Sequence, residues 1–152
     1  MLTHLIFLYD RDLTLLANEV NLYPTDESLW IVTDGIANSG GNLVLHLCGN
    51  LRHYIGFRLG AIDYRRDRPA EFSLRGLSKV ELLAKIELAR HAVATALTAL
   101  PAARLDELYP EEVMGAPMAV GFFLIHTNGH LRYHTGQINY HRRLLGNQMN
   151  LS

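Results

Sequence analysis

Apolar residues recur at steps of three and four through much of the chain, which is the pattern of amphipathic helices and not of strands. The first stripe predicts a helix of about twenty residues that ends before Pro24. Its members are Leu2, Leu5, Ile6, Tyr9, Leu13, Leu16 and Val20. A loop over 24–37 should follow, with a short turn around Leu29 and Trp30.

A second stripe predicts a helix that begins after Asn38 or Ser39, either of which can serve as its N-cap. We expect this helix to end at about Gly60, because glycine is a favoured C-terminal cap. Its apolar positions are Leu43, Leu47, Leu51, Tyr54, Ile55 and Leu59. The segment Asp63–Gly76, rich in charge and containing Pro69, is interpreted as an ordered connection without an element of its own.

The second half of the chain carries two further helical patterns. Ser78 and Glu81 have the spacing of a capping box, and the apolar series behind them predicts a helix that Pro101 ends. After another loop, Pro117 is well placed in the first turn of a long final helix. We expect that helix to reach about Leu145, with Gly146 as its cap.

Four helices of roughly twenty residues or more, joined by loops of about fifteen, predict an all-α protein. The expected architecture is an antiparallel four-helix bundle with long connections. At 152 residues, 49% of them hydrophobic, the chain should form a single domain over residues 1–152.

Charge and cysteine content narrow the classes of partner. A formal net charge of −1 gives no global field that would attract nucleic acid or an anionic membrane, and we expect neither partner. No uninterrupted apolar span is long enough to cross a bilayer. The lone Cys48 cannot form an internal disulfide, which fits a reducing, cytoplasmic location.

Histidines supply the most informative chemistry. His130 and His134 are four residues apart on the last predicted helix, so they share a face and can hold one metal ion. His126 precedes His130 by the same step, but the rise from His126 to His134 is about 12 Å, which one ion cannot easily span. The pair is therefore either His126 with His130 or His130 with His134. The obvious third ligand is His46, in the middle of a polar stripe on the second helix formed by Asn42, His46, Asn50 and His53.

Simpler interpretations compete with the metal site. A single histidine on an apolar face is more often a hydrogen-bonded core residue than a ligand. His126 is interpreted as packing in the core or beside the ligands, and the remaining histidines as surface or interface residues: His4, His53, His91 and His141. The arginines between Arg52 and Arg75 are interpreted as a solvated face paired with Asp63, Asp67 and Glu71. Core and interface packing is the simplest role for the aromatic residues of the last helix, Phe122, Phe123, Tyr133 and Tyr140.

Three blocks of sequence, 38–52, 64–72 and 130–138, resemble the DinB/YfiT-like metalloprotein superfamily, and the resemblance extends over nearly the whole chain. It implies a four-helix bundle of the up-down-down-up type, usually a homodimer. It also implies a divalent metal, nickel or zinc, held by one histidine of the second helix and two of the last. Those positions match His46, His130 and His134 here.

The resemblance implies one fold but several possible activities. Some relatives are thiol-dependent transferases or isomerases that use low-molecular-weight thiols, and others are described as metal-dependent hydrolases. Three neutral imidazoles and a divalent ion lower the pKa of a bound water or thiol, which is the chemistry common to these activities. A protease of the His-Glu-x-x-His kind is disfavoured because Leu131 occupies the position of the general base. If a base is required, His53 and His126 are the candidates near the stripe.

Two hypotheses of function therefore stand. The first is a metal-dependent enzyme of the thiol-transferase kind, acting on a small-molecule substrate. The second is a non-catalytic metal-binding or interaction bundle whose dimer interface is the function. A homodimer is expected mainly from the resemblance, with the mixed aromatic and basic surface of residues 140–143 as its other support.

Overall fold

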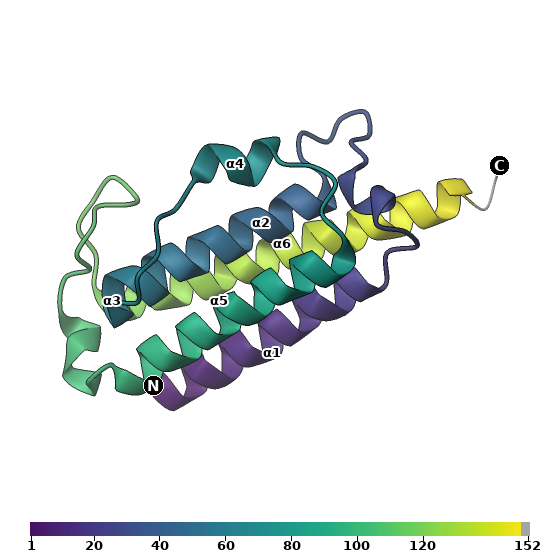
Figure 1. Ribbon diagram of the computed structural model, residues 1–152. Helices are drawn as coiled ribbons and strands as arrows, with labels where there is room; N and C mark the ends of the chain where they lie inside the picture. The colour runs from purple at the N-terminus through teal and green to yellow at the C-terminus, as the bar shows by residue number, and fades with distance from the viewer. Residues whose placement is uncertain (150–152) are drawn as a thin grey trace.

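The structure, a computed structural model, describes residues 1–149, with side chains through Gly146. Four long helical segments form the body of the molecule (Figure 1). They are α1 (Leu2–Asn21), α2 (Gly40–Leu51) with its continuation, α5 (Lys79–Ala99) and α6 (Val120–Met149). The continuation of α2 is a π-helical segment, Arg52–Phe57, followed by α3, Arg58–Gly60. Shorter elements are α4 (Arg68–Ser73) and two 3₁₀ turns, Glu27–Trp30 and Ala102–Asp106. Residues 1–149 contain no β-strand, so the all-α expectation is confirmed.

The bundle has an up-down-down-up order, because α1 and α6 run one way and α2 and α5 run the other (Figure 1). Side-chain contacts fix this order. On α1, the Tyr9 hydroxyl donates to the carbonyl of Leu124, and further along the Tyr23 hydroxyl donates to that of Ile138, so α1 and α6 are parallel. Helices α2 and α6 are antiparallel, since His46 contacts His130 whereas the later Tyr54 contacts the earlier Phe123.

Several predicted helix ends are confirmed. Helix α1 ends at Asn21, before Pro24, and the Ser39 hydroxyl caps α2 by accepting a hydrogen bond from the Asn42 amide at 3.2 Å. Ser78 and Glu81 form the reciprocal capping box at the start of α5, which ends at Ala99, before Pro101. The short turn around Leu29 and Trp30 is the first 3₁₀ segment.

The last helix, α6, begins later and ends later than the sequence predicts. Pro117 lies outside α6, which begins at Val120. Just before the helix, Ala119 forms an isolated antiparallel bridge with Leu108. There the Tyr109 amide donates to the carbonyl of Met118, and the Val120 amide donates to that of Glu107. At the other end Gly146 does not stop the helix, which continues to Met149.

The second helix ends at Gly60 as expected, but Gly60 is not the left-handed cap. That conformation belongs to Ala61, with φ 51°. Gly56 and Gly60 instead face α5, where a Cβ added at either glycine would press on Ala92 or Ala96. These two glycines therefore let the continuation of α2 approach α5 closely, as parallel neighbours.

The expectation that Asp63–Gly76 is only a connection is wrong, because it contains helix α4. The Asp67 carboxylate caps this helix by accepting from the Ala70 amide at 3.1 Å, and Pro69 lies in its first turn, where its missing amide hydrogen costs nothing. The Asn42 side-chain amide fastens α4 onto α2 by donating to the carbonyls of Glu71 (2.9 Å) and Leu74 (3.1 Å). Helix α4 thus lies across α2 and places Glu71 against it.

No helix among the described residues combines the length and the apolar character needed to cross a membrane.

Candidate metal centre

His46 of α2 meets His130 and His134 of α6 between the two antiparallel helices. The Nε2 atoms of His46 and His130 lie 3.0 Å apart. Ring centroids are 5.3 Å apart for His46 and His134 and 4.4 Å apart for His130 and His134. One ligand atom from each of the three residues lies within 4.8 Å of the others. The two helices therefore face each other at this height, as the polar stripes predict.

The spacing of these nitrogens fits a shared ion. Two imidazole nitrogens bound at about 2.0–2.1 Å lie roughly 2.9 Å apart at a right angle and roughly 3.3 Å apart at a tetrahedral angle. The 3.0 Å separation of the His46 and His130 nitrogens falls in that range. Three imidazoles are also the donor set of open, zinc-type catalytic sites.

Glu71 orients His46. The Nδ1–H of His46 donates to Glu71 Oε2 at 3.0 Å, which leaves the lone pair on Nε2, the atom that faces the cluster. Arg66 holds the carboxylate in turn, donating from Nε to Oε1 at 2.7 Å and from Nη2 to Oε2 at 2.9 Å. The carboxylate is thus bound on both oxygens inside the fold.

Glu71 lies inside the fold and not on its surface. It is only 5% exposed, so its assignment to a solvated charged face is wrong. One local signal in the sequence points to a short helix here: Asp67 can serve as an N-cap, and Pro69 follows in the first turn. That helix start places Glu71 in the first turn of α4. No local pattern connects that turn with His46, which lies 25 residues earlier.

Gly49 makes room for this carboxylate on α2. A Cβ at position 49 would collide with Glu71 Oε1, whereas the glycine lets the side chain lie directly on the helix backbone. The close approach of α4 to α2 therefore depends on a residue without a side chain at this point.

Gln137 orients His134 in a similar way. Its Oε1 lies 2.6 Å from His134 Nδ1 and accepts the Nδ1–H, while its Nε2 donates to the Tyr133 hydroxyl at 3.1 Å. The lone pair of His134 is then on Nε2. Two of the three histidines thus have a partner that fixes the same tautomer, with Nε2 as the free ligand atom.

His130 and His134 are neutral near pH 7. Burial, followed by the neighbouring His134 and His46, lowers the pKa of His130 to about 4. The pKa of His134 is also lowered, mainly by burial. For Glu71, burial raises the pKa, but hydrogen bonds from His46 and Arg66 outweigh it, so its pKa lies below the ordinary value. The two histidines of α6 are therefore neutral and Glu71 is ionised, which is the protonation state that metal binding requires of them.

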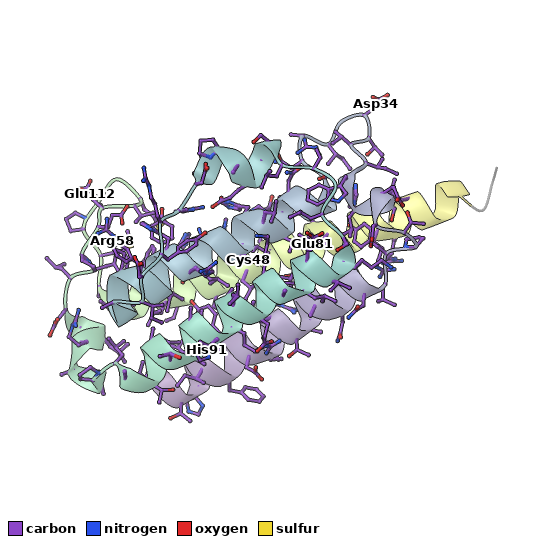
Figure 2. All side chains as sticks on the ribbon, in the orientation of Figure 1. Asp34, Cys48, Arg58, Glu81, His91 and Glu112 are labelled. Carbon is purple, nitrogen blue, oxygen red and sulfur yellow. The ribbon has the colours of Figure 1, made fainter. Side chains whose placement is uncertain are left out.

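The other histidines fall into separate environments. His126 is exposed and lines a cavity together with His46 and His130. His53 lies 3.3 Å from Glu111 Oε2, near the end of the bundle where Figure 2 places Arg58. Of the two candidate bases, only His126 lines that cavity.

His141 is not a surface residue, and its interpretation as one is wrong. It is 4% exposed, with Nδ1 2.7 Å from the Tyr23 hydroxyl and Nε2–H donating to the carbonyl of Ile31 at 2.9 Å. It ties the end of α1 and the following loop to α6. His4 and His91 are exposed, as expected.

The aromatic residues of α6 divide between core and surface. Phe123 is buried. The other three are largely exposed on the described chain: Phe122 (57%), Tyr133 (63%) and Tyr140 (68%).

Two cavities flank the histidine cluster. One, of about 270 Å³, has His46 and His130 in its wall, and the other, of about 490 Å³, has His134 and Gln137 in its wall. The smaller cavity is also lined by Asn50, Tyr54, Arg66, Arg68, Val113, Met114, Phe123, His126 and Thr127. The cluster can therefore be approached from two directions.

Comparison with models of known protein families matches residues 4–138 to the DinB superfamily. The matched span includes the three clustered histidines and α4. Comparisons with curated proteins and with solved structures found no match.

Proposed function

The chain belongs to the DinB superfamily, and we propose that it binds one divalent metal ion through His46, His130 and His134 and acts on a small-molecule substrate there. The observation that carries this proposal is the convergence of the three imidazoles, two of which have partners that leave Nε2 free. Nickel and zinc are the ions that we expect, since both accept imidazole ligands.

The reaction that fits the site best is a thiol-dependent transfer or isomerisation. A divalent ion held by three neutral imidazoles would lower the pKa of a bound thiol or water. The deprotonated nucleophile would then be available near neutral pH. The chain's own contribution is to hold His46 and His134 in one tautomer through Glu71 and Gln137. Burial also lowers the pKa of His130 and His134, so these two imidazoles are neutral. His126 is the imidazole in the adjoining cavity that can move a proton without being one of the three proposed ligands.

The two flanking cavities favour an enzyme over a closed structural site. A thiol and its acceptor need separate approaches to the reacting centre, and the cluster has one cavity on the His130 side and another on the His134 side. A purely structural metal site has its ligands closed around the ion. The runner-up remains a non-catalytic metal-binding bundle.

Metal content tests the ligand set. Purified protein should contain close to one equivalent of metal by mass spectrometry after dialysis, and His46→Ala, His130→Ala and His134→Ala should each lose most of it. His126→Ala is the matched control on the same face of α6 and should retain the ion. Equal loss in His126→Ala and His134→Ala would contradict the choice of His134.

A thiol-transfer screen tests the activity. Metal-loaded protein should accelerate transfer from at least one low-molecular-weight thiol to an electrophilic acceptor, and the His130→Ala protein should not. Metal-loaded protein that is inactive with every thiol, and that also fails with water as the nucleophile, would favour the non-catalytic bundle.

We also propose that the protein forms a homodimer through the outer face of α6. That face exposes five large apolar side chains on one helix: Phe122, Ile125, Tyr133, Tyr140 and Leu144. The last three also line the cavity beside His134, so the second subunit would form part of the wall of that cavity. Such a row on one surface is typical of an interface between subunits. Sedimentation equilibrium at micromolar concentration should give twice the mass of the 17.1 kDa chain, and Tyr133→Glu should reduce that value toward one chain. A wild-type mass of one chain would exclude the dimer.

A further inference from the structure

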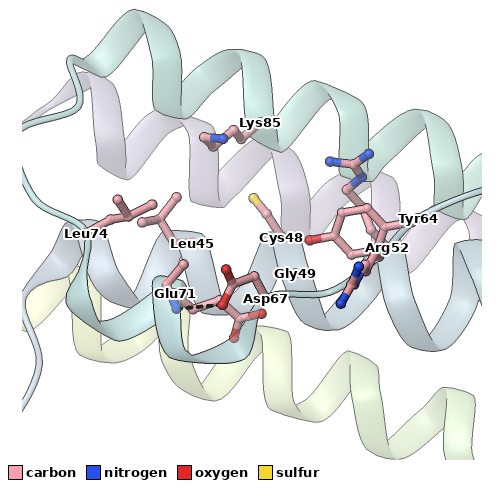
Figure 3. A pocket seen from close by; sticks show the side chains of 11 residues that line it. Leu45, Cys48, Gly49, Arg52, Tyr64, Asp67, Glu71, Leu74 and Lys85 are labelled. Atoms are coloured by element: carbon pink, nitrogen blue, oxygen red, sulfur yellow. Dashed lines mark hydrogen bonds between the residues drawn. The ribbon is translucent and has the colours of Figure 1, made fainter.

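A third cavity, of about 200 Å³, lies between α2, α4 and α5 and contains none of the three clustered histidines (Figure 3). Helix α2 supplies its floor, α4 one wall and Lys85 of α5 another. The close view shows Lys85 above Cys48, with Tyr64 and Arg52 beside it. Its wall includes Gly49 and Glu71, which support His46, but none of the three proposed ligands lines it.

Three cationic side chains from separate parts of the fold line this cavity. They are Arg52 after α2, Arg65 in the connection before α4, and Lys85 in α5. Across the part of the chain that the structure describes, none of the three has a carboxylate within ion-pair distance. Cations brought together without counterions repel one another, and an anion in the cavity would relieve that repulsion.

The acidic residues of the cavity do not neutralise these cations. Glu71 has both oxygens bound by Arg66, and Asp67 uses Oδ1 to cap α4. Because Arg66 pairs with Glu71, Asp67 is, among the described residues, the one carboxylate of the lining left to oppose the three cations. The lining therefore has an excess of positive charge. In Figure 3, Lys85 lies on the far side of Cys48 from Asp67 and Glu71, and Arg52 lies beside Tyr64.

Arg52 is held in place by the neighbouring Tyr64. The guanidinium carbon of Arg52 lies 4.0 Å from the centre of the Tyr64 ring, a stacked arrangement that leaves the N–H edges of the guanidinium available. The Tyr64 hydroxyl points toward Cys48 (Figure 3). Burial raises the pKa of the Cys48 thiol, so this thiol is uncharged near neutral pH. Together with Leu45 and Leu74 it forms an uncharged part of the cavity wall.

We propose that this cavity binds a small anion, a phosphate or carboxylate group, through Arg52, Lys85 and Arg65. The volume is below the roughly 300–1,000 Å³ of ordinary ligand pockets, so the bound group is small or is one end of a larger molecule. The cavity does not depend on the metal, and metal-free and metal-loaded protein both bind the anion.

Lysine reactivity gives a direct test, because Lys79 and Lys85 are the two lysines of the chain. Limited acetylation is measured by mass spectrometry in chloride, in inorganic phosphate and in malonate at equal ionic strength. Lys85 should be protected severalfold by phosphate or malonate, while Lys79, whose ammonium donates to the carbonyl of Tyr23 outside the cavity, serves as the internal control. Equal acetylation of Lys85 in all three salts would overturn the proposal.

Variants locate the binding. Phosphate and malonate are titrated into labelled protein and followed by amide chemical shifts, with and without metal. Arg52→Gln and Lys85→Gln should each weaken binding about tenfold, because a charged hydrogen bond is lost, whereas Arg143→Gln, an equal charge change on exposed α6, should shift it less than about twofold.

The two salts also separate the ligand classes. Saturation by phosphate alone assigns a phosphate-bearing ligand, and saturation by malonate alone assigns a carboxylate. Absence of saturable binding for both, or equal weakening in all three variants, would refute the site. If the protein failed to bind metal, or bound it without activity, the anion-binding results would be unaffected.

Discussion

Gly49 is the residue on which the position of Glu71 depends. Its missing side chain lets the Glu71 carboxylate lie on the backbone of α2, close enough to accept the Nδ1–H of His46. Arg66 binds the same carboxylate, so the buried charge is paired as well as hydrogen-bonded. Partners of this kind fix the tautomer and orientation of a metal-binding histidine.

Gly49→Ala should therefore displace Glu71. Helix propensity alone would favour alanine by about 1 kcal/mol, but the collision with Oε1 should outweigh it and lower the free energy of unfolding by about 1–3 kcal/mol. Metal affinity should fall about 10- to 100-fold as His46 loses its partner. Urea unfolding and competition with a chelating dye measure the two effects.

Gly129→Ala is the matched control. A Cβ at Gly129 on α6 would meet nothing within 4 Å, so this variant should be as stable as the wild type or up to about 1 kcal/mol more stable. Wild-type stability and metal affinity in Gly49→Ala would show that Glu71 does not occupy this position.

His130 predicts how the stability of the metal-free protein depends on pH. Its pKa is about 4 in the folded protein against 6.5 in an unfolded chain, so the unfolded state binds the proton more tightly. The stability that the neutral imidazole provides is complete above pH 6.5 and is lost as the pH falls toward 4. His134 and His141, whose pKa values are also lowered, contribute in the same direction.

Urea midpoints of chelator-treated protein at pH 7, 6 and 5 should decline, and the decline should be shallower in His130→Asn. Parallel curves for the two proteins would mean that His130 is protonated equally in the folded and unfolded states.

At the scale of elements, the long helices were predictable because each carries a repeating apolar stripe and a recognisable end. The Ser78–Glu81 capping box and Ser39 are local signals that act within one turn. Helix α4 has only six residues, too few for a period to appear, and its place depends on Asn42, far earlier in the chain. The π-helical segment Arg52–Phe57 likewise has no signal of its own in the stripe.

The same division applies to the candidate site. The i, i+4 spacing of His130 and His134 and the polar stripe around His46 are readable from the sequence, and the fold brings the three side chains together. The contact of Glu71 with His46 and the burial of His141 depend on tertiary packing between distant segments. The spacing of side chains on one helix could thus be predicted, whereas contacts that depend on where another segment packs, such as that of Glu71 with His46 or of His141 with Tyr23, could not.

Asn42→Ala should loosen α4 without unfolding the bundle. The side chain is fully buried and satisfies two carbonyls, so its loss should cost about 1–3 kcal/mol. Amide hydrogen exchange should accelerate at Leu74, which donates to Ala70 within α4, and stay slow in the middle of α5. Asn139→Ala, which removes a bond to Glu19 on α1, is the control and should leave α4 unchanged.

At the scale of the whole molecule, the up-down-down-up order is what sets His46 opposite His130. Helices α2 and α5 are parallel neighbours, so the chain must return along the bundle through residues 61–78, and α4 lies in that return. The same long connection supplies Arg66 and Glu71 behind His46 and Arg65 beside the cationic cavity. One crossover segment therefore contributes to both proposed sites.

An ion shared by α2 and α6 should stabilise the whole bundle, because the three nitrogens come together only in the folded chain. At a free metal concentration of about 100 times Kd the gain is about 2.7 kcal/mol. For a domain of this size that corresponds to a rise in Tm of roughly 5–10 °C. Scanning calorimetry with nickel or zinc, and again after chelation, measures it. The rise should be absent in His130→Ala, which lacks a ligand, and should persist in His126→Ala. An unchanged wild-type Tm on chelation of protein shown to contain metal would mean that the ion does not bridge the two helices, since a bridge present only in the native state must shift the unfolding equilibrium.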